Sequence, residues 1–291
     1  MDPMIYFLGV ILAILSGIAN NFGTLLQKKV VNEHKGDEEF LKNLARNKIW
    51  LFGLILQLVI GAIFFMVAQL LIGPALVPGL MAAGLIVLAL GSVKILGETL
   101  KRDEYIGIII MVIGILLLGF SELSIPTETL NLLDYVFTMS TFTVILTLCA
   151  IMCKVAANRI ERVKALLLAI FSGLMISLTN FWISPLMTVF EQMNFTPGYI
   201  AIFITASVIL ILTNIFGITE LQKAFTAGQA SNLIPVQQVP IQITPIFIYF
   251  FVFLQTAHPI AFVFISIGIA LIIISSFLLG KRQAQMEEIQ K

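Results

Sequence analysis

Charged side chains are scarce in this sequence of 291 residues. Asp, Glu, Lys and Arg together make up 11% of the chain, whereas 59% of the residues are hydrophobic and the mean hydropathy is +1.04. Soluble domains usually carry about 25% charged residues, so this shortage excludes a water-soluble fold with a charged surface. The formal net charge of +1 also provides no basic face for nucleic acid. The composition therefore predicts an integral membrane protein.

Histidine and cysteine are also rare, which argues against an enzyme. His34 and His258 are the only histidines, and the topology derived below places them on opposite sides of the membrane, where they cannot share a metal or a catalytic centre. Cys149 and Cys153 lie in an apolar run, where we expect them to pack as small side chains. The sequence has no HExxH pair, no GxSxG elbow and no phosphate-binding glycine loop. We therefore expect neither an enzyme nor a cofactor.

Long apolar runs fill most of the chain. A membrane-spanning helix needs about 20 mainly apolar residues, and nine runs approach or reach this length. They are Met4 to Gln27, Ile49 to Leu70, Ala75 to Leu96, Tyr105 to Phe120, Leu132 to Cys153, Ala165 to Phe190, Tyr199 to Ile218, Ala230 to Leu254 and Pro259 to Leu279. The sequence thus predicts an all-α polytopic membrane protein with about nine transmembrane helices.

The basic residues fall on one side of this arrangement. All 17 Lys and Arg lie in or beside the first, third, fifth and seventh connections, or in the C-terminal tail. Cytoplasmic loops collect Lys and Arg. We therefore expect a multi-pass protein of the cell membrane with its N-terminus outside and its C-terminus in the cytoplasm.

Three short sequences recur at nearly one offset. Ala13 to Ile18 matches Ala169 to Leu174 at a shift of 156, and the matches of Gly73-Pro-Ala75 with Gly228-Gln-Ala230 and of Ile113-Gly-Ile115 with Ile267-Gly-Ile269 have shifts of 155 and 154. Equivalent helices are separated by five spans, so the second copy must be inverted in the membrane. We expect a first repeat over 1–131, a linking helix and basic loop over 132–164, an inverted repeat over 165–280 and a cytoplasmic tail over 281–291.

Some of these segments carry a resemblance to a known family. Ala68 to Pro78, followed by Gly97-Glu98, Tyr105-Ile-Gly107 and Ile113-Gly114, resembles the EamA-type repeat of the drug/metabolite transporter superfamily. Gln222 to Phe225, leading into Ala230 to Pro235, is similar to the second-repeat motif of the NIPA-like magnesium transporters, whose nine-helix form has its C-terminus inside. The resemblance implies secondary transport and, for the NIPA-like family, Mg²⁺ as the cargo.

Polar residues inside the apolar runs mark the faces that turn inward. Polar side chains in hydrocarbon usually face the bundle interior or a cavity. In the first run the polar residues Asn20, Asn21 and Thr24 share one helical face with Gly17 and Gln27. The offset of 156 carries Gly17, Asn21 and Thr24 onto Gly173, Ser177 and Asn180. These residues are candidate substrate contacts, and the alternative is that they hold helices together through hydrogen bonds.

The eighth run is the most unusual because prolines and glutamines alternate in it. Pro235, Pro240 and Pro245 are spaced by five, and a proline removes a backbone donor, so we expect them to bend or interrupt this helix. Gln238 and Gln242 share one face and, with Asn232, are the leading candidates for substrate binding; the alternative is a kinked packing helix. Gln57 in the second run is a weaker candidate.

Few charges are placed where they could couple transport to an ion. Lys94 lies near the cytoplasmic end of the third run and is expected either to reach the interface or to contact an anion or coupling ion. Glu98 follows one turn later, as a solvated carboxylate or as the partner of Lys94. No Asp or Glu falls in the middle of a predicted span, although Mg²⁺ prefers carboxylates.

The function therefore has three candidates at this stage. The missing acids favour a carrier of a small polar or amphipathic solute, whereas the nine-helix layout favours a Mg²⁺ transporter. A non-transporting scaffold subunit is the third. The expected partners are the lipid bilayer and a small solute or ion, not nucleic acid; the metal ligands and a homo-oligomer are left open.

Overall fold

The computed structural model describes residues 3–34, 36, 39–72, 77–121, 123, 131–192 and 196–289, and side chains within these ranges except at 3, 69, 70, 78, 79, 190, 191 and 280–289. No strand occurs in these ranges, so the all-α prediction is confirmed. The elements are α1 (Pro3–Glu33), α2 (Phe40–Arg46), α3 (Lys48–Ile55), the π-helical turn η1 (Leu56–Ile60), α4 (Gly61–Ile72), α5 (Val77–Met81), α6 (Gly84–Leu96), α7 (Arg102–Gly119), the 3-10 turn η3 (Leu132–Tyr135), α8 (Val136–Arg159), the 3-10 turn η4 (Glu161–Val163), α9 (Lys164–Glu191), α10 (Pro197–Ala227), α11 (Ala230–Phe247), the π-helical turn η5 (Ile248–Val252) and α12 (Pro259–Ile289).

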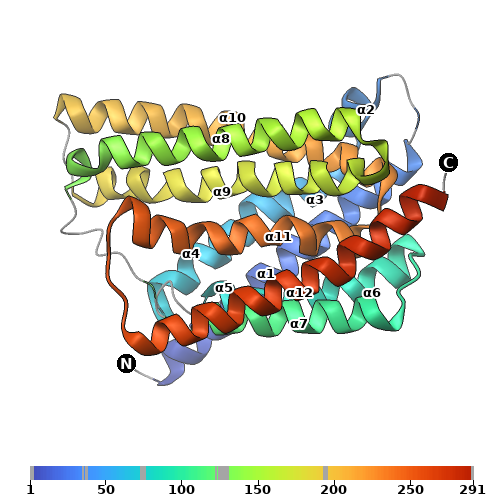
Figure 1. Cartoon of the computed structure of the whole chain (residues 1–291), viewed down its shortest axis with the longest axis horizontal. Helices are drawn as coiled ribbons and strands as arrows, with labels where there is room; N and C mark the ends of the chain where they lie inside the picture. Colours follow the sequence, from blue (N-terminus) through green and yellow to red (C-terminus); the bar gives the residue numbers. More distant parts are fainter. Residues whose placement is uncertain are drawn as a thin grey trace.

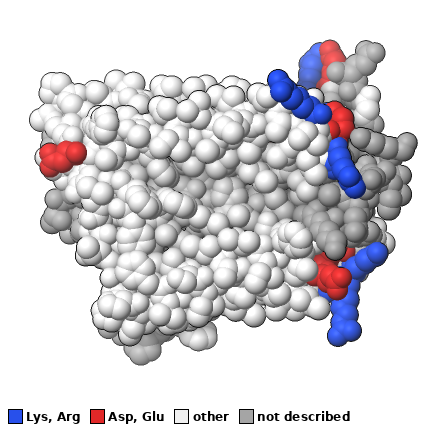
Figure 2. Space-filling view, viewed as in Figure 1, with Lys and Arg blue, Asp and Glu red and all other residues white. Residues whose placement is uncertain are grey.

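The long helices lie side by side in an elongated bundle and alternate in direction along the chain (Figure 1). α1 starts at the left end of the view and α12 finishes at the right end, so the chain enters and leaves at opposite ends of the bundle. Lys and Arg side chains gather at the right end of the face in Figure 2. We call this end, where α6, α8 and α10 finish and α7, α9 and α11 begin, the basic end.

Seven stretches of the described helices are long and apolar enough to cross a membrane. They are Met4–Glu33, Lys48–Ala68, Leu132–Arg159, Glu161–Val189, Pro197–Ala227, Ala230–Val252 and Pro259–Leu279. The other two runs predicted from the sequence do not qualify: the run from Ala75 to Leu96 is divided between the separate helices α5 and α6, and α7, although 18 residues long, opens with the charged residues Arg102, Asp103 and Glu104. Large apolar side chains such as Phe137 (81% exposed) and Phe277 (70% exposed) point outward, as expected for a surface covered by lipid rather than water.

Small residues let the helices of the bundle approach closely. A Cβ added to Gly17 of α1 would lie 2.1 Å from the Met81 carbonyl oxygen, and one added to Gly173 of α9 would lie 2.4 Å from the Gln237 carbonyl oxygen. Gly17 and Gly173 differ by 156 in residue number, and so do their partners Met81 and Gln237. Such small-residue contacts are typical of helices packed within a membrane.

A second close contact joins α7 to α12. A Cβ on Gly114 would lie 3.0 Å from the Gly268 carbonyl oxygen, and one on Gly268 would lie 2.9 Å from the Gly114 carbonyl oxygen. The contact is reciprocal, and the two glycines differ by 154. The recurring motifs of the sequence therefore pack in equivalent ways, except Gly73 to Ala75, which lies outside the described residues.

Of the two effects expected of the prolines in the eighth run, a bend or an interruption, the interruption does not occur. α11 continues through Pro235, Pro240 and Pro245, and ends in the π-helical turn η5. Each proline removes only one donor from the helix, and packing on both sides holds the remaining backbone: most residues from Ala230 to Gln237 are buried. The break in this region precedes α11, at Gly228 and Gln229.

Candidate functional site

Two helix ends meet inside the protein at the basic end. α10 finishes at Ala227, Gly228 adopts an extended conformation (φ −136°, ψ 164°), and α11 begins at Ala230. The end of α10 presents carbonyl oxygens and the start of α11 presents N–H groups, which need partners when they are buried. We call residues 225–232 the α10–α11 junction.

Lys28 of α1 binds the carbonyl side of this junction. Its ammonium group donates to the Phe225 carbonyl and, at 2.7 Å, to the Gly228 carbonyl. Its Nζ also lies 5.7 Å from the centre of the Phe225 ring. Although Lys28 is only 5% exposed, its charge is compensated by the carbonyls and by the negative end of the α10 dipole.

Glu98 binds the opposite side of the same junction. The turn after α6 bends at Gly97 (φ 69°), and this directs Glu98 towards α11. The Glu98 carboxylate accepts from the backbone N–H of Ala230 at 2.7 Å, from the Ser231 N–H at 3.2 Å and from the Ser231 hydroxyl at 2.7 Å. It therefore supplies the N-terminal cap of α11 from a distant part of the chain.

A row of amide side chains lies beside Lys28. Gln27 donates to Gln57 at 2.7 Å, Gln222 donates to Gln27 at 2.8 Å, and the Trp50 indole donates to Gln222 at 3.2 Å. Gln27 and Gln222 are each 1% exposed. The row connects α1, α3 and η1 with α10.

Asn232, one turn into α11, is fully buried and only partly satisfied. Its amide donates to Gln229 at 3.5 Å, whereas its Oδ1 atom has no hydrogen-bond partner. Glu220 of α10 is buried and paired with both Lys154 of α8 and Lys223 of α10. The pair with Lys154 connects α8 to α10 near the junction.

The residues predicted from the sequence are not gathered around one cavity. Of these eleven, Glu98 and Asn232 are at the junction and Gln57 is in the adjoining row. Asn21, Thr24 and Ser177 are buried and donate to carbonyls of their own helices, those of Gly17, Asn20 and Gly173. Gln242 donates to Gln238 at 3.3 Å, and both are half-buried. Asn20 is half-buried, while Asn180 and Lys94 are exposed.

The interpretation of Glu98 as a solvated carboxylate or as the partner of Lys94 is wrong. α6 ends at Leu96 before Glu98 is reached, so the helical spacing that would pair it with Lys94 does not exist. Glu98 is instead 8% exposed and bonded to α11. This arrangement depends on the left-handed turn at Gly97, which brings the carboxylate inward.

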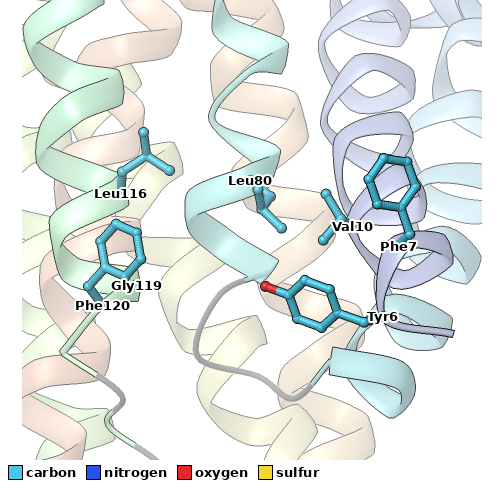
Figure 3. Close-up of a pocket in the computed structure, with 7 residues that line it drawn as sticks. All are labelled: Tyr6, Phe7, Val10, Leu80, Leu116, Gly119 and Phe120. Atoms are coloured by element: carbon cyan, nitrogen blue, oxygen red, sulfur yellow. The ribbon is translucent and has the colours of Figure 1, made fainter. Parts of the chain in front are cut away.

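Two pockets in the described part of the protein are apolar. The one in Figure 3, of about 320 Å³, is lined by residues of α1, α5 and α7 together with Phe120. The phenol oxygen of Tyr6 is the polar side-chain atom seen among its lining residues in Figure 3. A second, of about 350 Å³, lies between α8, α9 and α11. Neither includes a predicted substrate residue, so the polar candidate site is the closed junction and not an open cavity.

Several residues of the site were not expected to contact substrate. The sequence predicts Gln27 and Gln222 only as parts of a polar stripe and of a motif, and Lys28 only as a charge of the first connection; it carries no prediction for Trp50. No sequence signal places Lys28 inside the bundle, because only the fold shows that α1 continues past it to Glu33. Among the described residues no group of three or more His, Cys, Asp or Glu could hold a metal ion.

Comparisons with known proteins did not identify a related protein. No protein-family model matches the chain, and no curated protein and no solved structure matches it significantly. The site must therefore be interpreted from its own chemistry: buried amides and carbonyls, one ammonium group and one carboxylate, at a break between two helices.

Proposed function

We propose that this protein is a secondary transporter of the drug/metabolite type, which moves a small polar or amphipathic solute by alternating access. The observation that carries the proposal is the buried polar junction, where Lys28 and Glu98 of residues 1–131 bind both sides of the connection between α10 and α11 in residues 165–280. Helix ends that meet inside a membrane protein offer carbonyl and N–H groups to a polar solute or ion, as the half-helix ends of transporters do. A purely structural bundle gains little from burying charges there.

The equivalent packing contacts support two inverted repeats within nine spans. Ser16 donates to the Gly61 carbonyl at 2.7 Å, and their counterparts Ser172 and Gly217 also meet, since a Cβ on Gly217 would lie 3.5 Å from the Ser172 carbonyl oxygen. α1 and α9 run in opposite directions along the bundle (Figure 1). Two copies related in this way can rock against each other and expose a central site to one side at a time.

The proposed topology follows from the basic end. Its Lys and Arg residues favour a cytoplasmic location for this end by the positive-inside rule. This puts the junction near the cytoplasmic side and the start of α1 outside, in the cell membrane.

A Mg²⁺ transporter is the second candidate, and one observation favours it. The Phe225 and Gly228 carbonyl oxygens already bind a cation, the ammonium group of Lys28. However, Mg²⁺ usually binds through one or more carboxylates with retained waters, and Glu98 is committed to the N–H groups of α11. We therefore rank the small polar or amphipathic solute first.

Transport in proteoliposomes tests the proposal. Mg²⁺ entry is measured first with an internal dye at an inside-negative potential. A panel of labelled polar metabolites follows, chosen by the rise in melting temperature that each causes. We expect saturable uptake of at least one solute, and Gln222→Ala should reduce it, because Gln222 lies in the row between the two copies. The matched control is Gln255→Ala, since this glutamine bonds only to the nearby Phe253 carbonyl.

The outcomes separate the three functions. Saturable Mg²⁺ entry that Gln222→Ala removes would replace the solute carrier with the cation transporter. If neither Mg²⁺ nor any solute enters faster than into empty liposomes, the protein is a scaffold and the proposal fails.

A further inference from the structure

The polar contacts between the two copies concentrate at the basic end. Lys28 and Glu98 bind the α10–α11 junction, and Gln27 and Trp50 bind Gln222. Towards the other end, α7 meets α11 and α12 through apolar groups: Phe120 lies 6.3 Å from Phe264 between ring centres, and Leu118 packs with Ile246 and Ala261.

The equivalent positions of the second copy cannot reproduce these polar contacts. An offset of 156 carries Gln27 and Lys28 onto Ile183 and Ser184, and Glu98 onto Leu254. Because the second copy runs the other way, these residues lie towards the opposite end. Among the described residues, the buried charges Lys28 and Glu98 thus lie at one end, while the packing glycines occur in both copies.

Burial of these two charges is costly in a membrane protein, and charged residues in such positions usually serve function. Both charges are held by helix ends rather than by each other. If residues 1–131 move away from the junction, Lys28 and Glu98 leave together and expose carbonyl and N–H groups that water can then solvate. The interaction is therefore strong when closed and readily replaced by water when open.

We propose that Lys28 and Glu98 form the latch of a gate at the basic end, and that the structure shows this gate closed. The proposal rests on the transport function above and deepens it. Lys28 and Glu98 are positioning residues: they keep the pathway shut at the cytoplasmic end while the solute exchanges at the other end. Opening requires both charges to leave the junction, together with separation of Gln27 from Gln222.

Cysteine accessibility tests the latch without any substrate. Cys149 and Cys153 are replaced by Ser, and Asn232→Cys supplies a reporter at a position that is 0% exposed. A membrane-impermeant maleimide is added to vesicles whose basic end faces outward. With the latch intact we expect slow labelling, and Lys28→Met should raise the rate by on the order of tenfold, as for the loss of one buried charge at a helix terminus.

Two further variants test whether the labelling rate depends on the latch charges. Glu98→Gln keeps an acceptor oxygen but loses the charge, so its labelling rate should lie between those of wild type and Lys28→Met. Lys42→Met is the matched control, because Lys42 is an exposed lysine at the same end whose ion-pair partner among the described residues is Glu39, three residues earlier. It should label at the wild-type rate.

A cross-link separates gate opening from unfolding. A short bifunctional methanethiosulfonate reagent should cross-link Gln27→Cys to Gln222→Cys readily when the latch is intact, and more slowly after Lys28→Met, while the melting temperature of the uncross-linked protein stays close to its parent. Wild-type labelling and cross-linking rates in folded Lys28→Met and Glu98→Gln would overturn the latch, even if solute uptake is observed. A working latch without flux of any solute or ion would instead sink only the transport function.

Discussion

Gln27 and Lys28 near the end of α1 correspond to Ile183 and Ser184 in α9, yet the glycines earlier in the same two helices make the same contacts. Gly17 meets the Met81 backbone and Gly173 meets the Gln237 backbone. Gln27 and Lys28 bind across to α10, whereas Ile183 is 43% exposed. The contacts that recur at this offset therefore build the bundle, and the contacts found at only one of two offset positions distinguish its two ends.

The shared contacts should be the most sensitive to mutation. Gly17→Val and Gly173→Val each place atoms within 2.1 to 2.4 Å of a carbonyl oxygen that cannot move without its helix, so both should abolish the folded, monodisperse protein in size-exclusion chromatography. Gly61→Ala is the milder control, since its nearest contact would be 3.3 Å. If Gly173→Val folded normally while Gly17→Val did not, the equivalence of the two copies would be lost.

Removal of the Glu98 carboxylate should have the next largest effect. Glu98→Ala leaves the buried N–H groups of Ala230 and Ser231 without an acceptor, and we expect a loss of about 1.5 to 3 kcal/mol in the free energy of unfolding. Thermal unfolding in detergent measures it. Glu161→Ala, at an exposed carboxylate paired with Lys164, should change stability by less than about 0.5 kcal/mol. Equal effects of the two variants would show that the capping contact contributes nothing.

The amide row should have the smallest effect on stability. Gln222→Leu removes its bonds to Gln27 and Trp50, and we expect a loss of about 1 to 2 kcal/mol together with a changed Trp50 emission, measured in a Trp182→Phe background. Gln238→Leu is the comparison, because it breaks only the 3.3 Å bond with Gln242. It should cost less and leave the Trp50 emission unaltered. An unchanged Trp50 signal in Gln222→Leu would contradict the contact between α3 and α10.

The sequence predicted the helical class and the segregation of basic residues well. Apolar runs and the positions of Lys and Arg can both be recognised within short stretches of sequence, without knowledge of distant contacts. It placed the polar stripe on inward faces, but Asn21, Thr24 and Ser177 bond to carbonyls one turn back, which short polar side chains readily do in helices. Glu98 could not be placed from spacing, since its partner lies at position 230 and is reached only through the turn at Gly97. Contacts between distant segments require the fold itself.

The separation of the two copies at each end of the bundle, measured by double electron–electron resonance, tests the central claim most directly. One spin-label pair at Lys94 and Lys164 reports on the basic end, and a second pair at Phe7 and Ile200 reports on the other end; Lys164 is half-buried and the other three residues are exposed. Alternating access predicts that Lys28→Met lengthens the first distance and shortens the second. A scaffold predicts that both distances remain at their wild-type values, and that result would contradict the proposed transport cycle.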